Sequence, residues 1–206
     1  MRSIQASKSQ AYQESFVLNV LNFKCFGTFL ELGGGDGIEA SNTFLLENQF
    51  NWKGLSLEYN LEMYTTFKTM RRTECLCEDA TNWEATRHLE RRDFPKQIDY
   101  LQIDVDPARQ SLEALVNLPL GDYRFSTITF EHDYYVEKDS EVRDASRTLL
   151  KSLHYHLFFA GVQTHGRNFE DWWIDTTIPG LKGYQNLYFE DMEASMIFTE
   201  GVLEDF

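Results

Sequence analysis

The sequence predicts an α/β protein with a mostly parallel β-sheet and helices on both faces. Short apolar runs alternate along the chain with segments of helical periodicity, which is the pattern of such sheets. The chain has only four prolines, and we find no repeat or linker in it. Its 206 residues suit one substantial domain, and a content of 42% hydrophobic and 15% aromatic residues excludes disorder of the bulk of the chain.

Each element follows from a local pattern. Residues 7–22 place Phe16, Val17 and Val20 on one helical stripe, which predicts an opening helix. Residues 28–32 form an apolar run that ends in glycines, which is typical of a buried strand. Beyond them we expect helices over 39–49, 61–70, 83–90, 108–116 and 140–153, strands over 54–58, 74–77, 98–103, 125–130 and 156–163, and an edge strand at 172–174.

The net charge of −14 predicts which partners the chain avoids. A field of this sign repels nucleic-acid phosphates and anionic lipids unless a basic patch overcomes it. The pairs Arg71-Arg72 and Arg91-Arg92 come closest to such a patch, and we interpret both as solvated faces. No apolar run approaches the roughly 20 residues of a membrane span, and residues 1–13 lack the apolar stretch of a secretion signal. We therefore expect a cytoplasmic protein without nucleic-acid or membrane partners.

Acidic residues follow five of the predicted strands. Parallel sheets of this kind bind ligands beyond the carboxyl ends of their strands, so these residues are the first candidates for chemistry. The candidates are Glu31, Glu58, Glu78 with Asp79, Asp104 with Asp106, and Glu131 with His132.

The turn after the first strand reads Glu31-Leu32-Gly33-Gly34-Gly35-Asp36-Gly37. A dinucleotide fingerprint would need a further glycine where Ile38 stands, so the spacing disfavours a pyrophosphate site. Gly33, Gly35 and Gly37 allow the main chain to turn sharply and to lie flat against a ligand. The charges of Glu31 and Asp36 favour a cationic ligand, such as S-adenosylmethionine with its sulfonium and ammonium groups. The alternative is a loose turn without a ligand.

Two later strand ends complete this candidate pocket. Glu58 stands 27 residues after Glu31, where an acidic side chain can accept hydrogen bonds from both ribose hydroxyls. Asp79, next to Ala80, is a candidate partner for an adenine amino group, and Tyr59 is a candidate to stack on the base. Asp79 and Tyr59 are equally compatible with ordinary surface positions.

A methyl transfer to an alcohol needs alignment and removal of the hydroxyl proton. His132 is the only histidine at a predicted strand end, and imidazole titrates near neutral pH, so it is the leading candidate base. Asp104 and Glu131 are the accompanying catalytic candidates. The alternative for His132 is a structural histidine hydrogen-bonded to Glu131 or Asp133.

The same region also offers candidate metal ligands. Asp104, Asp106, Glu131 and His132 supply oxygen and imidazole groups that suit Mg²⁺ or Mn²⁺, and a bound ion would acidify a coordinated hydroxyl. Nothing in their spacing demands a metal.

Several ordered blocks of sequence resemble the FkbM-type branch of class I S-adenosylmethionine-dependent methyltransferases. They are the glycine turn with Ser41-Asn42-Thr43, and then residues 52–60, 99–106, 127–132 and 169–173. The resemblance implies a Rossmann-like, seven-stranded, mostly parallel sheet with a reversed final strand, and O-methylation of a hydroxyl on a small molecule or sugar. It also implies a cofactor site made of Glu31, Gly33, Gly35, Gly37, Glu58 and Asp104.

The sequence departs from the family pattern at two places. Tyr59 stands where such proteins often have proline, which alters the expected adenine wall. Asp106-Pro107 stands where they often have Glu-Gly, which changes the substrate side.

These observations predict an N-terminal helix in residues 1–26, a methyltransferase-like domain over 27–175 and an extension over 176–206. We expect that extension to pack on the sheet edge, over the pocket or on a partner chain, which would give a homo-oligomer. The expected activity is methylation of a small-molecule or glycan acceptor. Two alternatives are a module that binds S-adenosylmethionine without catalysis and, less favoured, a nicotinamide-dependent oxidoreductase.

Overall fold

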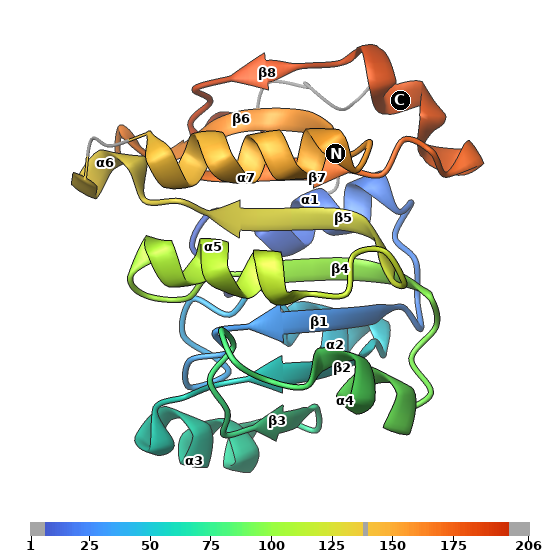
Figure 1. The fold of residues 1–206 in the computed structure, drawn as a ribbon, viewed down its shortest axis with the longest axis vertical. Coiled ribbons are helices and arrows are strands. Elements are labelled where there is room, and N and C mark those ends of the chain that lie inside the picture. Colours follow the sequence, from blue (N-terminus) through green and yellow to red (C-terminus); the bar gives the residue numbers. More distant parts are fainter. Residues whose placement is uncertain (1–6, 138–139, 198–206) are drawn as a thin grey trace.

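The fold is an eight-stranded sheet with the strand order β3-β2-β1-β4-β5-β7-β6-β8, seen in a computed structural model that describes residues 7–137 and 140–197 (Figure 1). The predicted α/β class, with a mostly parallel sheet, is confirmed. The strands are β1 (Thr28–Leu32), β2 (Lys53–Leu57), β3 (Glu74–Leu76), β4 (Gln97–Ile103), β5 (Arg124–Glu131), β6 (His156–Thr164), β7 (Arg167–Ile174) and β8 (Phe189–Glu190).

The sheet is parallel from β3 through β5, and β7 then runs antiparallel between β5 and β6. The expectation of an edge strand at 172–174 is therefore wrong. Trp172 pairs with Thr129 on β5. Trp172 and Trp173 are both fully buried, because other elements cover both faces of a central strand. The reversed final strand that the resemblance implied is this β7. The resemblance implied seven strands, and the sheet has an eighth, because the chain beyond β7 adds the two-residue β8 beside β6.

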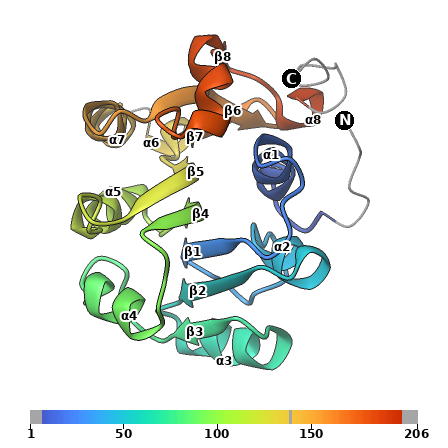
Figure 2. The ribbon, with the colours of Figure 1, turned by 90° about the vertical axis from the view of Figure 1, so that its right-hand side faces the viewer.

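Helices cover both faces of the sheet, as Figure 2 shows. One face carries α4 (Ala85–Arg91), α5 (Ala108–Asn117) and α7 (Glu141–Ser152). The other carries α1 (Gln13–Val20), α2 (Phe44–Phe50) and α3 (Leu61–Met70). Each face has its own apolar core. The short α6 (Tyr134–Glu137) follows β5 at the carboxyl end of the sheet (Figure 1).

The helix expected over 39–49 begins only at Phe44. Ala40 has a left-handed φ of 55°, and the Oδ1 atom of Asp36 accepts hydrogen bonds from the N–H groups of Ile38 and Glu39, which holds the preceding residues in a turn. The glycine turn therefore continues into a structured loop, and α2 starts behind it.

The chain beyond β7 packs against the β6 side of the sheet. It forms a 3₁₀ helix (Pro179–Asn186), β8 and α8 (Ala194–Ile197). Leu181, Ala194 and Ile197 are buried in the core that α1 shares. The boundaries expected at 26/27 and 175/176 stay predictions, and residues 198–206 lie outside the described ranges. Within those ranges, no helix is long and apolar enough to cross a membrane.

Candidate functional site

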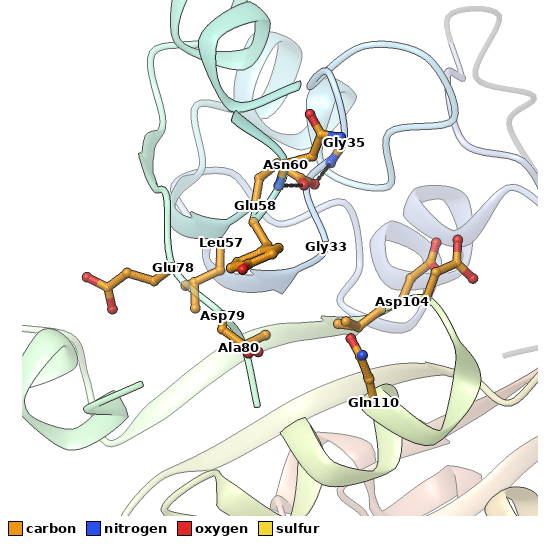
Figure 3. Close-up of a pocket in the computed structure, with 13 residues that line it drawn as sticks. Gly33, Gly35, Leu57, Glu58, Asn60, Glu78, Asp79, Ala80, Asp104 and Gln110 are labelled. Atoms are coloured by element: carbon orange, nitrogen blue, oxygen red, sulfur yellow. Dashed lines mark hydrogen bonds between the residues drawn. The ribbon is translucent and has the colours of Figure 1, made fainter. Parts of the chain in front are cut away.

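A cavity of about 720 Å³ lies at the carboxyl ends of β1 through β4. This is where a parallel sheet presents a ligand site. Figure 3 shows Glu58 and Asn60 separated across the cavity from Asp104 and Gln110. The cavity is lined by Gly33, Gly35, Leu57, Glu58, Tyr59, Asn60, Glu78, Asp79, Ala80, Asp104, Val105, Asp106 and Gln110.

The alternate glycines of the first turn have three different surroundings. All three have left-handed φ values, which glycine adopts without steric cost. A Cβ on Gly33 would lie 1.8 Å from the carbonyl oxygen of Asp104, and one on Gly37 would lie 2.8 Å from side-chain atoms of Arg71 and Phe67. A Cβ on Gly35 would meet nothing within 4 Å, because it would point into open space beside the cavity. Gly33 and Gly37 therefore shape the turn, whereas Gly35 lines the cavity with open space beside its Cα atom.

Glu58 is held by the main chain at the end of β2. Its Oε2 atom accepts a hydrogen bond of 2.8 Å from the N–H of Gly35, and its Oε1 atom accepts one of 2.7 Å from the N–H of Asn60 (Figure 3). The side chain of Asn60 in turn caps α3 by accepting from the N–H groups of Glu62 and Met63. Each carboxylate oxygen keeps a further lone pair, so Glu58 is a fixed acceptor for a ligand hydroxyl.

The adenine-side candidates also line the cavity. Ala80 is buried, whereas the side chain of Tyr59 is 76% exposed. The Oδ1 atom of Asp79 accepts from the N–H and hydroxyl of Thr81, and its second carboxylate oxygen has no hydrogen-bond partner within residues 7–137 and 140–197. The side chain of Tyr59 is thus outside the apolar core, and one oxygen of the Asp79 carboxylate is held by Thr81.

Glu31 and Asp36 do not line the cavity. Glu31 is buried beneath the turn, where its Oε1 accepts from the hydroxyl of Thr43 at 2.7 Å and its Oε2 from Ser56 at 2.5 Å. Burial raises the pKa of Glu31, and the Arg71 charge opposes that effect. Asp36 uses its carboxylate within the turn itself. Their predicted contact with the cofactor stays a prediction, and Gly37 likewise lies behind the lining.

Asp104 and Glu131 form a pair of carboxyl groups at the ends of β4 and β5. The two groups act on each other, because hydrogen bonding to Glu131 lowers the pKa of Asp104 and the charge of Asp104 raises the pKa of Glu131. Burial, opposed by this hydrogen bond and reinforced by the charges of Asp106 and Asp133, raises the pKa of Asp104 to about 7. Burial and the negative charges of Asp104 and Glu170 raise the pKa of Glu131 well above its usual range. The structure thus places two carboxyl groups with raised pKa values close to the cavity, with Asp104 in its lining.

His132 faces away from this pair. Its side chain is fully buried, and its Nε2 atom lies 3.4 Å from Oδ1 of Asp171, too poorly aligned for a hydrogen bond. Arg147 donates two hydrogen bonds to the same carboxylate, at 2.7 and 2.8 Å. Burial raises the pKa of Asp171, but the hydrogen bond and charge of Arg147, together with His132, outweigh that effect and lower this pKa to about 2. Neither His132 nor Glu131 lines the cavity, and the role of His132 as a base stays a prediction.

The four candidate metal ligands do not come together. Asp104 and Asp106 line the cavity, whereas the imidazole of His132 lies against Asp171. Within residues 7–137 and 140–197, no group of three or more histidine, cysteine or acidic side chains is arranged to hold a metal ion.

Some residues near the cavity were not expected from the sequence, or were expected to be exposed. Asn60 and Gln110 line the cavity, and the place of Asn60 before a predicted helix was a signal for a cap that also faces the site. Arg71 was interpreted as solvated, which is wrong: its side chain has no exposed surface, and its Nη1 atom donates to the carbonyl of Gly37 at 3.0 Å. The sequence gives no sign that Arg71 is buried, because the neighbouring Arg72 is of the same type and is exposed.

Comparison with known proteins bears on the fold. No family model matches the sequence, and no curated protein matches it. Solved structures do. A putative rRNA-methylase from Clostridium thermocellum matches with a TM-score of 0.56 at 10% identity, over 83% of this chain and 97% of that one. The chain has the Rossmann-like fold of class I methyltransferases.

Two further neighbours support this fold. A fibrillarin from Aeropyrum pernix, crystallised with natively bound S-adenosyl-L-methionine, matches with a TM-score of 0.52 at 14% identity, over 81% of this chain and 75% of that one. The METTL16 methyltransferase domain matches with a TM-score of 0.53 at 11% identity, over 77% of this chain. Our chain spans 64% of the length of that domain.

These comparisons correct one expectation. The charge led us to exclude nucleic acid as a partner, and that exclusion is contradicted, because one neighbour with this fold is a putative rRNA-methylase. Net charge is a property of the whole chain, and it does not decide what a local surface binds. The FkbM subtype, the acceptor and the cytoplasmic location stay predictions.

Proposed function

We propose that this protein is an S-adenosylmethionine-dependent methyltransferase. One observation carries the proposal: the glycine turn, Glu58, Asp79 and Asp104 converge from four neighbouring strand ends on one cavity, in a sheet with the class I methyltransferase strand order. The space at Gly35, which a Cβ would fill, and the carboxylates around the cavity suit a ligand with an adenosyl group and positive charge.

In this proposal Glu58 accepts hydrogen bonds from the ribose hydroxyls, while the N–H of Gly35 fixes the direction of its carboxylate. Asp79 and Tyr59 border the adenine, and Gly33 and Gly35 bring the main chain close to the rest of the cofactor. The bound cofactor supplies an electrophilic methyl group on a sulfonium sulfur.

We further propose a hydroxyl acceptor, on a small molecule or sugar, as the FkbM-like blocks imply. The Asp104–Glu131 pair lies at the end of the cavity formed by β4 and takes the hydroxyl proton. As the oxygen forms its bond to the methyl carbon, the carbon–sulfur bond breaks and its electrons stay on sulfur, which leaves the neutral thioether product. A group with a pKa near 7 suits this task, because about half of it is deprotonated at neutral pH and the deprotonated form is still basic.

A nucleic-acid acceptor is the second candidate, favoured by the fold shared with a putative rRNA-methylase. Its ribose hydroxyls would use the same proton acceptor.

Calorimetric titration with S-adenosylmethionine tests the cofactor proposal. We expect micromolar binding, weakened about tenfold or more in Glu58→Gln, because a charged acceptor for two hydroxyls becomes a neutral one. The exposed Glu62→Gln is the matched control. No binding by the wild-type protein would overturn the proposal. Transfer of a labelled methyl group to separate panels of hydroxylated metabolites, glycans and structured RNA then decides the acceptor class.

A further inference from the structure

A buried polar network centred on Arg71 lies behind the glycine turn. The guanidinium of Arg71 donates to Oε2 of Glu47 at 3.0 Å, to the carbonyl of Gly37 at 3.0 Å, to the hydroxyl of Ser41 at 3.2 Å and to that of Thr43 at 3.0 Å. Arginine is suited to this position, because its planar fork directs several donors in fixed directions. One side chain from the end of α3 therefore ties together α2, the loop before it and the turn.

Aromatic rings fix the plane of this guanidinium. Its Cζ atom lies 4.9 Å from the ring centre of Phe67 and 5.7 Å from that of Phe44. The Phe67 ring also underlies the turn, since a Cβ on Gly34 would be 3.1 Å from it and one on Gly37 would be 2.8 Å from it. Arg71 and Phe67 therefore pack together against the glycine turn, at Gly34 and Gly37.

Thr43 extends the network to Glu31. Its hydroxyl accepts from Arg71 and donates to Oε1 of Glu31 at 2.7 Å. The Oε2 atom of Glu31 lies 3.5 Å from where the Cβ of Gly34 would be, which places this carboxylate directly under the turn. Arg71 thus contacts the turn directly at Gly37 and indirectly at Gly34.

We propose that Arg71, acting through Thr43 and Glu31, is the positioning residue that sets the glycine turn for the cofactor. This inference rests on the proposed function. Glycines have the widest conformational freedom of all residues, so a turn rich in them keeps one shape only when its surroundings impose it. The network does so from the side opposite the cavity, and Glu31 acts from beneath the turn rather than as a direct ligand.

Two isosteric substitutions test the link. Thr43→Val removes the hydroxyl between Arg71 and Glu31. Thr73→Val removes a buried hydroxyl that bonds to Glu47, on the side of the network away from the turn. We expect both variants to lose thermal stability, more in Thr43→Val because its hydroxyl makes two hydrogen bonds and that of Thr73 makes one. We expect only Thr43→Val to bind S-adenosylmethionine more weakly, by about tenfold. Equal affinity of Thr43→Val and wild type, or equal losses in both variants, would overturn the inference.

A conservative pair checks the arginine itself. Arg71→Lys keeps the charge and loses the fork, so we expect weaker cofactor binding, whereas the same change at the exposed Arg72, which contacts the same Glu47, leaves affinity unchanged. Full affinity in Arg71→Lys would contradict a positioning role for the fork.

Amide hydrogen exchange of Gly35 in the free protein supplies a readout without cofactor. We expect faster exchange in Thr43→Val than in Thr73→Val, because the turn loses its support only in the first. Equal exchange rates would overturn the inference even if no variant bound the cofactor. If the wild-type protein did not bind the cofactor, that result would count against the proposed function. The exchange rates at Gly35 would still test whether the network supports the turn.

Discussion

The main chain of Gly33 packs against the carbonyl oxygen of Asp104, so closely that a Cβ on Gly33 would lie 1.8 Å from that oxygen. The N–H of Asp104 also donates to the carbonyl of Leu32 at 3.0 Å. The end of β1, which carries the glycine turn, and the end of β4, which carries the proposed proton acceptor, are therefore fixed to each other.

This contact separates two glycine variants. Gly33→Ala should unfold the carboxyl end of the sheet or lower its melting temperature severely, because its methyl group meets main-chain atoms that cannot move aside. Gly35→Ala meets no protein atom and should cost only about 1–2 kcal/mol of strain from its left-handed φ. We expect Gly35→Ala to fold and to lose cofactor affinity, because its methyl group enters the cavity. Thermal melts and calorimetry on both variants check this, and wild-type affinity in Gly35→Ala would count against the cavity as the cofactor site.

The Asp104–Glu131 pair predicts a pH dependence of turnover. Because burial and neighbouring acids raise the pKa of Asp104 to about 7, the rate at saturating cofactor should increase as the pH rises through about 7. The charge of Asp106 contributes to that high pKa, so Asp106→Asn should move the midpoint to lower pH by roughly half a unit. Glu113→Gln, an exposed change on α5, should leave the profile unchanged. A flat wild-type profile between pH 5.5 and 8.5 would remove the pair from the mechanism.

Glu170 predicts a pH dependence of stability. Burial above all, and the negative charge of Asp104, raise its pKa from 4.5 to about 8. A carboxyl group with a higher pKa in the folded than in the unfolded chain stabilises the fold fully below the unfolded value and loses that effect as the pH rises through the folded value. We expect the melting temperature to fall by about 5 °C between pH 6 and 8.5, with a smaller fall in Glu170→Gln. The exposed Glu62→Gln should behave as wild type, and an unchanged fall in Glu170→Gln would show that other groups are responsible.

His132→Ala distinguishes a buried structural histidine from a base. The side chain is enclosed beside Asp171 and Arg147, so its loss should lower the free energy of unfolding by about 2–3 kcal/mol. We expect turnover of the folded variant to stay within about twofold of wild type. A general base would instead cost about 10²- to 10⁴-fold in rate with unchanged cofactor affinity. Turnover at a temperature well below the variant's melting point, read beside its unfolding curve, decides between the two.

Local pattern predicted much of the sheet and part of the site. The apolar runs predicted the main strands to within one or two residues, apart from β7, of which only the last three residues were expected. Parallel strands bring their carboxyl ends to one edge, so Glu58, Asp79 and Asp104 line one cavity as expected from their places in the sequence. The sharp turn after the first strand was predicted as well, because alternate glycines directly after a buried strand indicate left-handed backbone conformations, which Gly33, Gly35 and Gly37 adopt.

Only the tertiary structure decided which face each neighbouring residue serves and what lies behind the turn. Successive residues at a strand end point to opposite faces, so Glu131 meets Asp104 while the adjacent His132 meets Asp171. Arg71 and Arg72 look alike in sequence, and only the packing of α3 against the turn buries the first. The place of β7 between β5 and β6 likewise depends on pairing between distant segments, which no local pattern records. Short-range order along the chain determined the elements, and long-range contacts determined which side chains meet.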